Sequence, residues 1–150
     1  MLGRHDGQID IFNSMIYEQL IPKDHLLIKI DEIVDFSHIY DVVKDSYSHI
    51  GRKSKDPVIM YKLCLLGYIY RLSDPQVVLR TQTDVAFRWF LRLKLDEKVP
   101  DDSVMSRFRT ERLADQGVDE MFKDIVKQCI ENDLIKTHRY MIDSTDVAAC

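Results

Sequence analysis

The sequence has few of the residues that break regular structure, and it lacks any long apolar run. Only 5 glycines and 4 prolines occur among its 150 residues, which argues against a disordered or low-complexity chain. No stretch approaches the roughly 20 apolar residues that cross a bilayer, and the start of the chain lacks the apolar core of a secretory signal. We therefore expect a globular protein of the cytoplasm, of single-domain size, with no membrane partner.

Cysteine and histidine are too few and too scattered for a disulfide framework or a metal centre. The cysteines, Cys64, Cys129 and Cys150, are widely separated, and the first two fall within apolar helical patterns. The 5 histidines lack the spacing of metal ligands and have no cysteine partner. The cysteines are expected to be buried thiols, and the histidines receive no functional role.

The net charge of −4 is unevenly distributed along the chain. Residues 1–50 hold 4 Lys/Arg against 9 Asp/Glu, and residues 116–150 hold 4 against 7. Residues 51–115 hold 13 Lys/Arg against 9 Asp/Glu, a net charge of +4. An excess of basic residues in the middle of an acidic chain indicates an element that binds a polyanion.

Apolar periodicity and capping residues predict helices along most of the chain. The strongest start is Asp56-Pro57, because Asp is a good N-cap and the missing N–H of proline costs nothing at the first helical position. Twelve of the sixteen residues in 57–72 are apolar or tyrosine, so this helix is expected at the centre of the fold. Ser37, Ser73 and Ser103 are predicted caps, and the other predicted helices cover 24–36, 38–47, 76–82, 86–95, 104–114 and 118–130.

These patterns predict a mainly α protein, a compact multi-helix bundle with helix-turn-helix-like elements. Residues 1–22 are expected to be poorly structured, and residues 23–136 to form the helical domain. The period of the pattern changes near the end of the chain. There, residues 137–150 contain the alternation typical of one short β-strand.

Two basic segments are candidates for contact with nucleic acid. Arginines and hydroxyls on a short helix after a turn suit phosphate contacts and guanine readout in the major groove, and a flexible basic loop can clamp phosphates. The alternative for the helix is an ordinary solvated face, neutralised by Glu111, Asp101 and Asp115, and the loop could equally be solvated. The helix candidates are Ser103, Ser106, Arg107, Arg109 and Arg112, and the loop candidates are Arg52, Lys53 and Lys55.

Two further features are weaker candidates. The aromatic run Phe87, Trp89 and Phe90 could stack on bases, but its leucine neighbours favour a place in the core. Asp143 and Asp146 are three residues apart. In an extended strand they would point to opposite faces, so together they cannot easily chelate one ion.

Four short motifs follow one another along the chain: GRKSKDPV, FRWFL, VPDDSVMSRFR and IDST. Each is weak alone, but their order and spacing resemble the N-terminal region of bacterial insertion-sequence transposases of the DDE class. The similarity spans roughly Leu27 to Ala149. It implies a helical region that recognises transposon-end DNA, followed by an RNase H-like catalytic domain.

In that family the first catalytic aspartate lies in the strand motif that matches IDST, so the resemblance makes Asp143 a catalytic residue and a metal ligand. Three acidic side chains hold two Mg²⁺ ions there, which activate water or a 3′-hydroxyl for attack on a phosphodiester. This chain departs from the family at Asp146, where relatives often carry His or Tyr. It also ends at Cys150, before any further acidic motif.

The expected function is therefore the DNA-binding N-terminal part of a DDE-type transposase, truncated, inactive alone and holding no Mg²⁺ stably. Its partner would be double-stranded DNA of the terminal inverted repeats. The alternative is a helical protein-interaction module that forms a homo-oligomer, or a mixed oligomer that regulates full-length transposase, through helix 118–130. A third hypothesis, an intact metal-dependent nuclease, needs an acidic cluster that the sequence does not contain.

Overall fold

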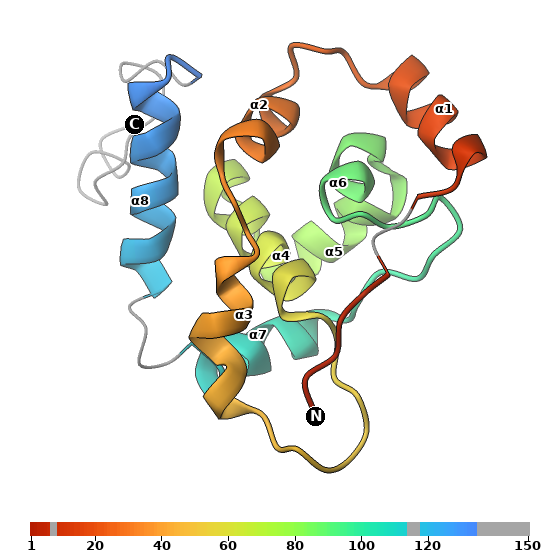
Figure 1. The fold of residues 1–150 in the computed structure, drawn as a ribbon. Coiled ribbons are helices and arrows are strands. Elements are labelled where there is room, and N and C mark those ends of the chain that lie inside the picture. Colours follow the sequence, from red (N-terminus) through yellow and green to blue (C-terminus); the bar gives the residue numbers. More distant parts are fainter. Residues whose placement is uncertain (7–8, 114–117, 135–150) are drawn as a thin grey trace.

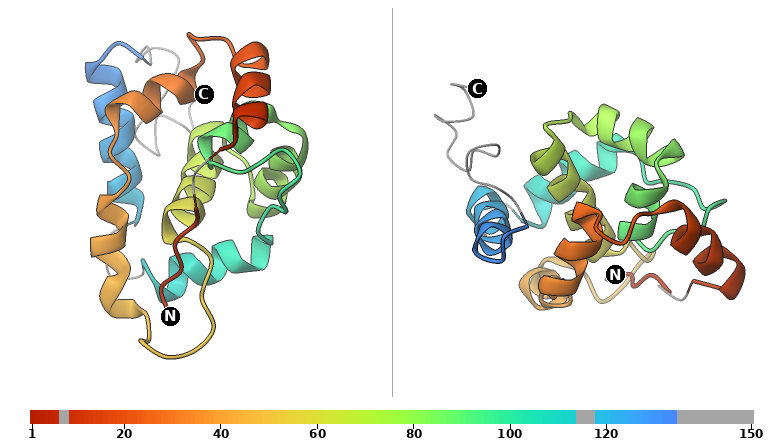
Figure 2. Two further views of the ribbon diagram at one scale, coloured as in Figure 1. Left: turned by 45° about the vertical axis from the view of Figure 1, so that its right-hand side comes forward. Right: turned by 90° about the horizontal axis from the view of Figure 1, so that it is seen from above.

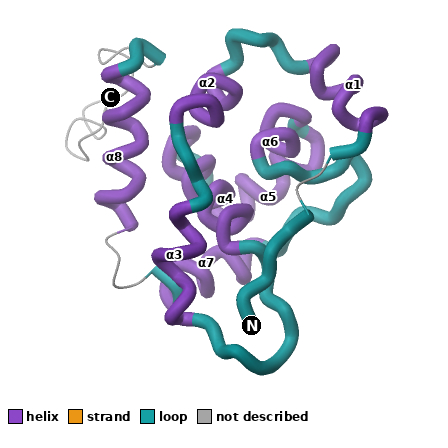
Figure 3. Tube along the Cα trace, viewed as in Figure 1, coloured by secondary structure: helices purple, strands orange, loops and turns teal. Residues whose placement is uncertain are grey.

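Helices make up most of the protein. The computed structural model describes residues 1–6, 9–113 and 118–134. No strand occurs in this part of the chain (Figure 3), which confirms the mainly α class; the predicted strand in 137–150 lies outside the described residues. The helices are α1 (Ile11–Leu20), α2 (Leu26–Ile33), α3 (His38–Val43), α4 (Pro57–Tyr70), α5 (Asp74–Thr83), α6 (Val85–Phe90), α7 (Asp102–Glu111) and α8 (Val118–Glu131), with a 3₁₀ turn, η1 (Lys44–Ser46), after α3.

Helix α4 is the centre of the fold, as its composition predicts. The Asp56 carboxylate accepts a hydrogen bond from the Val58 backbone N–H at 2.8 Å, and Pro57 occupies the first turn. Every residue in 59–66 is buried. Helices α3, α5, α7 and α8 pack around α4 (Figure 1), so it supplies the common core of the molecule.

Helices α5 and α6 begin at the polar residues that the sequence predicts. Ser73 and Gln76 form a capping box, in which each side chain accepts a hydrogen bond from the other's backbone N–H. Asp84 ends α5 by donating its N–H to Arg80 O at 2.9 Å, and it begins α6 by accepting from Phe87 N at 3.1 Å. One residue therefore joins the two helices without a loop.

The aromatic residues of α6 are part of the core. Phe87 and Phe90 are buried and Trp89 is half-buried. The Phe90 ring meets Phe36 edge-on at 5.6 Å between centroids, and the Phe87 ring lies 5.1 Å from that of Tyr70. These contacts confirm the core interpretation of the aromatic run.

The first 22 residues carry more structure than the sequence suggests. Asp10 caps α1 by accepting a hydrogen bond from Asn13 N at 2.8 Å, and the buried Tyr17 hydroxyl donates to Leu93 O at 2.6 Å. The expectation of a poorly structured segment is therefore wrong for α1. Its apolar residues lie on both sides of the helix, so no one-sided periodicity reveals it.

Two other helices begin at residues that the sequence did not indicate. Helix α7 begins after Asp101, whose side chain makes no capping hydrogen bond, and Ser103 lies exposed within the first turn. The predicted Ser103 cap is therefore wrong. Helix α2 begins after His25, whose ring Nδ1 accepts a hydrogen bond from Leu27 N at 3.1 Å.

A buried ion pair joins three elements near the centre of the fold. Lys62 of α4 donates from Nζ to Phe90 O at 2.8 Å and approaches Asp31 Oδ1 of α2 at 3.4 Å. Asp31 also accepts from Arg92 Nη2 at 2.5 Å. Burial lowers the pKa of Lys62 to about 8, and the carboxylate of Asp31 opposes that change.

Helix α8 packs with its apolar side against α2 and α4, and Figure 2 shows it beside the segment that carries α2 and α3. Its Phe122 ring lies 5.3 Å from the ring of Tyr61 and 5.3 Å from that of Tyr68. Ile125 and Cys129 are buried on the same side. The helix predicted for 118–130 is thus confirmed, and its apolar face is used within the chain.

Candidate nucleic-acid interface

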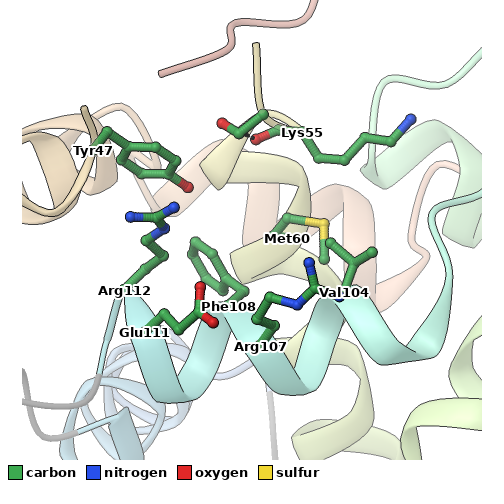
Figure 4. Close-up of a pocket in the computed structure, with 9 residues that line it drawn as sticks. Tyr47, Lys55, Met60, Val104, Arg107, Phe108, Glu111 and Arg112 are labelled. Atoms are coloured by element: carbon green, nitrogen blue, oxygen red, sulfur yellow. Dashed lines mark hydrogen bonds between the residues drawn. The ribbon is translucent and has the colours of Figure 1, made fainter. Parts of the chain in front are cut away.

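The two basic segments predicted from the sequence meet at one pocket. The loop 47–56 forms one wall, with Ser54 and Lys55, and helix α7 forms the other, with Arg107 and Arg112 (Figure 4). The pocket has a volume of about 250 Å³. Residues more than fifty positions apart in the sequence are therefore neighbours on one surface.

Helix α7 presents Arg107 to this pocket on the same face as Val104 and Phe108, which also line the pocket and fix the helix to the core (Figure 4). Met105 and Phe108 are buried, and Val104 is half-buried. Arg107 is exposed, and its guanidinium points toward the side of the pocket that carries Lys55 (Figure 4). Among the described residues, no ion pair joins Arg107 to Glu111, although they are one turn apart.

Arg109 points away from the pocket and joins α7 to α5. Its guanidinium forms a bidentate ion pair with Asp74, with Nη1 at 3.0 Å from Oδ1 and Nη2 bonded to Oδ2. Nη1 also lies 3.4 Å from the buried Cys64 Sγ. The hydrogen bonds from Asp74 raise the pKa of Arg109 above its usual value. Arg109 therefore has a structural role that its place in the sequence did not indicate.

Arg112 lines the pocket but is held by the protein. Its guanidinium carbon lies 3.9 Å from the centroid of the Tyr47 ring, and Nη1 donates to the Ser46 carbonyl. Burial raises the pKa of Tyr47, so its hydroxyl stays neutral. The cation–π contact and the hydrogen bond tie the end of α7 to the segment after α3. No local sequence pattern reports a contact between positions 47 and 112, and Tyr47 was therefore missed as a lining residue.

The remaining candidates lie on the exposed surface near the pocket. Arg52, Lys53 and Lys55 are all exposed in the loop, as a solvated basic loop predicts, but only Lys55 lines this pocket. Ser103 and Ser106 are exposed on α7 outside its lining. Arg107 and Lys55 are thus the two basic residues of the pocket whose charged groups remain available to a ligand.

The predicted metal ligand cannot be placed in this site. Asp143 lies outside the described residues. Across residues 1–6, 9–113 and 118–134, no three His, Cys, Asp or Glu side chains gather as a metal ion would require. Within the same ranges, no helix is long and apolar enough to cross a membrane.

A comparison with models of protein families shows the family to which this chain belongs. A family model described as Transposase domain (DUF772) matches residues 15–111. The chain belongs to this transposase-domain family. No solved structure matches the chain.

The transposase-domain match contains most of the pocket. It begins within α1 and ends at the last residue of α7, so Lys55 and Arg107 lie inside it. Arg112 and helix α8 follow it. The transposase domain as matched therefore includes both basic segments, and α8 is an additional helix packed on the same core.

Proposed function

We propose that this transposase domain binds duplex DNA at the pocket between the loop 47–56 and α7, and that it recognises transposon-end DNA for a DDE-type transposase. The observation that carries the proposal is the convergence of Lys55 and Arg107 from two separate basic segments. Both side chains are exposed, and neither has an ion-pair partner among the described residues. Cations left without a protein partner are available to phosphate oxygens.

The two walls of the pocket contribute differently to the proposed contact. Helix α7 is fixed to the core and to α5, so Arg107 approaches DNA from a rigid support. A planar guanidinium can bind a phosphate or the O6/N7 edge of guanine with two hydrogen bonds. Lys55 acts as a point charge on the backbone, as does Lys53, and Arg52 can contact a phosphate from the exposed edge of the loop. Sequence preference is therefore assigned to Arg107, and general affinity to the lysines.

The test is a comparison of two double variants in binding to a terminal-inverted-repeat duplex and a scrambled duplex. Lys55→Ala with Arg107→Ala is expected to weaken binding to the inverted-repeat duplex at least tenfold. The slope of log K against log salt should fall by about 0.9, because Lys55 supplies one phosphate contact, and the preference over the scrambled duplex, assigned to Arg107, should be lost. The control, Lys94→Ala with Lys127→Ala, removes the same charge from exposed positions outside this pocket. Equal affinities for the two double variants would reject the proposal.

The wider role in DNA transposition follows from the resemblance. There, Asp143 would supply one acidic ligand for Mg²⁺ in strand cleavage and transfer. Asp143 is not among the residues that the structure describes, so these residues show no step of that reaction. Binding to transposon ends is a separate property, and it is measured without metal-dependent cleavage.

A second candidate function, self-association, is favoured by helix α1 and replaces the predicted contact through α8. Ile11, Phe12, Met15 and Leu20 are 81%, 74%, 53% and 58% exposed, and the first three lie on the side of α1 away from the buried Tyr17. A hollow of about 720 Å³ beside Met15 is lined by Ile28 and Trp89, among others. An apolar ridge next to a hollow of mixed polarity can pair with a second copy of itself about a two-fold axis.

Charge also suits a second copy of this chain as the occupant of that surface. Glu18 and Lys23 both line the hollow and are exposed, so a two-fold contact can place them opposite each other. Phe12→Asp is expected to convert a dimer into a monomer in sedimentation experiments. Leu79→Asp, at another exposed apolar position, is the control and should leave the dimer intact. A monomeric wild-type protein at high concentration would exclude this candidate.

A further inference from the structure

The N-terminal segment 1–6 is fixed against the basic loop by several hydrogen bonds. Met1 O accepts from Ser54 N at 2.9 Å, and Gly3 N donates to Ser54 Oγ at 3.2 Å. His5 N donates to Asp56 Oδ2 at 2.5 Å, and the His5 ring Nε2 lies 2.6 Å from Glu97 Oε1. The beginning of the chain is therefore a structural part of the surface around the loop.

A second hollow, of about 190 Å³, lies where this segment meets the loop. Its lining includes Arg4, Lys53, Lys55 and Lys98. All four side chains are exposed. The guanidinium of Arg4 is supported by the Tyr40 ring, with 4.3 Å from its central carbon to the ring centroid, and stacking of this kind leaves its N–H groups free to donate in the plane.

The two carboxylates of this hollow are engaged by the protein. Asp56 accepts hydrogen bonds from Val58 N at 2.8 Å and from the Tyr40 hydroxyl at 2.7 Å, in addition to the bond from His5 N. Glu97 accepts from Lys94 N at 3.0 Å and meets the His5 ring. The inward-facing acids are thus satisfied, while the four cations have no carboxylate partner among the described residues.

Ser54 and Lys55 line both this hollow and the pocket beside α7. We propose that the two form one continuous phosphate-binding track, in which a DNA strand crosses Lys55 from Arg107 to Arg4 and Lys98. The inference rests on the proposed function and extends it to two residues outside the two basic segments. Arg4 precedes the transposase-domain match, and Lys98 lies in the turn before α7.

The extended track predicts a measurable contribution from its far end. Arg4→Ala with Lys98→Ala is expected to weaken duplex binding about tenfold and to lower the salt slope by about 1.8, since two phosphate contacts are lost. Inverted-repeat and scrambled duplexes should be affected equally, because backbone contacts carry no sequence information. Lys94→Ala with Lys127→Ala again serves as the charge-matched control, and Lys94 lies on the same turn as Lys98 but outside the hollow.

Gly3→Ala tests the placement of the segment without removing a charge. A Cβ at position 3 would collide with the Ser54 carbonyl, so the segment has to shift and carry Arg4 away from the track. We expect Gly3→Ala to weaken duplex binding nearly as much as the single variant Arg4→Ala does. The melting temperature of the helical core should be unchanged. Circular dichroism checks the core in every variant.

The outcomes separate this inference from the proposed function. If Lys55→Ala with Arg107→Ala weakens binding while Arg4→Ala with Lys98→Ala matches the control, the pocket stands and the extended track is rejected. If the wild-type protein binds duplex DNA no better than the pocket variant, the proposed function itself fails. Loss of affinity and of salt slope in both double variants, with Gly3→Ala following Arg4→Ala, establishes the track.

Discussion

Arg107 and Arg109 are two residues apart on α7 and have different environments. Arg107 is exposed at the pocket, and Arg109 forms a bidentate ion pair with Asp74 on α5. A helix rotates by roughly 200° over two residues, so the two side chains point to opposite sides. Two residues of the same type therefore have different roles: Arg107 is exposed at the pocket, and Arg109 joins α7 to α5.

Arg109→Ala is expected to lower the free energy of unfolding by about 1 to 2 kcal/mol, because it removes a part-buried bidentate ion pair and leaves Asp74 without its partner. Arg107→Ala should change it by less than about 0.5 kcal/mol, as an exposed substitution does. Urea denaturation measures both. A larger loss of stability in Arg107→Ala than in Arg109→Ala would contradict this division.

Lys62 makes a contribution to the free energy of unfolding that depends on pH. Its folded-state pKa is about 8, whereas a lysine in the unfolded chain titrates near 10.4. Above pH 8 the unfolded chain therefore binds more protons than the folded chain, and this contribution to stability rises with pH. Burial also raises the pKa of Cys64 and Cys129 to about 11, and their contribution falls as pH rises above about 9 because the unfolded thiols ionise first.

The difference in unfolding free energy between the wild-type protein and Lys62→Met isolates the lysine, because both proteins share the cysteines. We expect this difference to shift in favour of the wild type by about 2 kcal/mol between pH 7 and pH 10. Asp31 keeps Arg92 as a partner in the variant, so the fold is retained. Denaturation curves at several pH values test this, and a difference independent of pH would show that the pKa of Lys62 is not lowered in the folded protein, so that the lysine keeps its proton as it does in the unfolded chain.

At the scale of elements, the start of α4 connects the core with the proposed DNA-binding surface. Asp56 caps the helix, accepts from the Tyr40 hydroxyl of α3 and holds His5 N of the N-terminal segment. It is only 7% exposed. One carboxylate thus fixes three elements around the loop 47–56.

Asp56→Ala is expected to cost about 3 kcal/mol, the sum of a lost N-cap and of hydrogen-bond donors left in a buried site. The control, Ser73→Ala at the exposed capping box of α5, should cost about 1 kcal/mol. Thermal or urea unfolding gives both values. Equal costs would mean that the bonds from Tyr40 and His5 to Asp56 contribute little.

At the scale of the whole molecule, α8 completes the core although it follows the transposase-domain match. Phe122 is 4% exposed between the rings of Tyr61 and Tyr68. Phe122→Ala is therefore expected to lower the unfolding free energy by about 3 to 5 kcal/mol in a dilute, monomeric sample. A variant that keeps its stability but loses an oligomer in sedimentation would instead assign this face to a subunit contact.

The features that could be predicted correctly from the sequence are those that depend on residues close together in the chain. Asp56-Pro57, Ser73 and the apolar content of 57–72 located α4 and α5, because capping and helical periodicity act within one or two turns. The burial of the aromatic run in α6 followed from its leucine neighbours. Helix α1 and the start of α7 were missed, since α1 is apolar on both sides and Asp101 makes no capping bond.

Which basic side chains remain available to a ligand depends on the tertiary structure. Asp74 occupies Arg109, Tyr47 and Ser46 hold Arg112, and Lys55 and Arg107 line one pocket without an ion-pair partner among the described residues. The placement of Arg4 beside the same loop depends on contacts about fifty residues apart. Such pairings are set by how helices pack on α4, and no local pattern encodes them, because the energy of a charged side chain depends on the groups that the fold brings next to it.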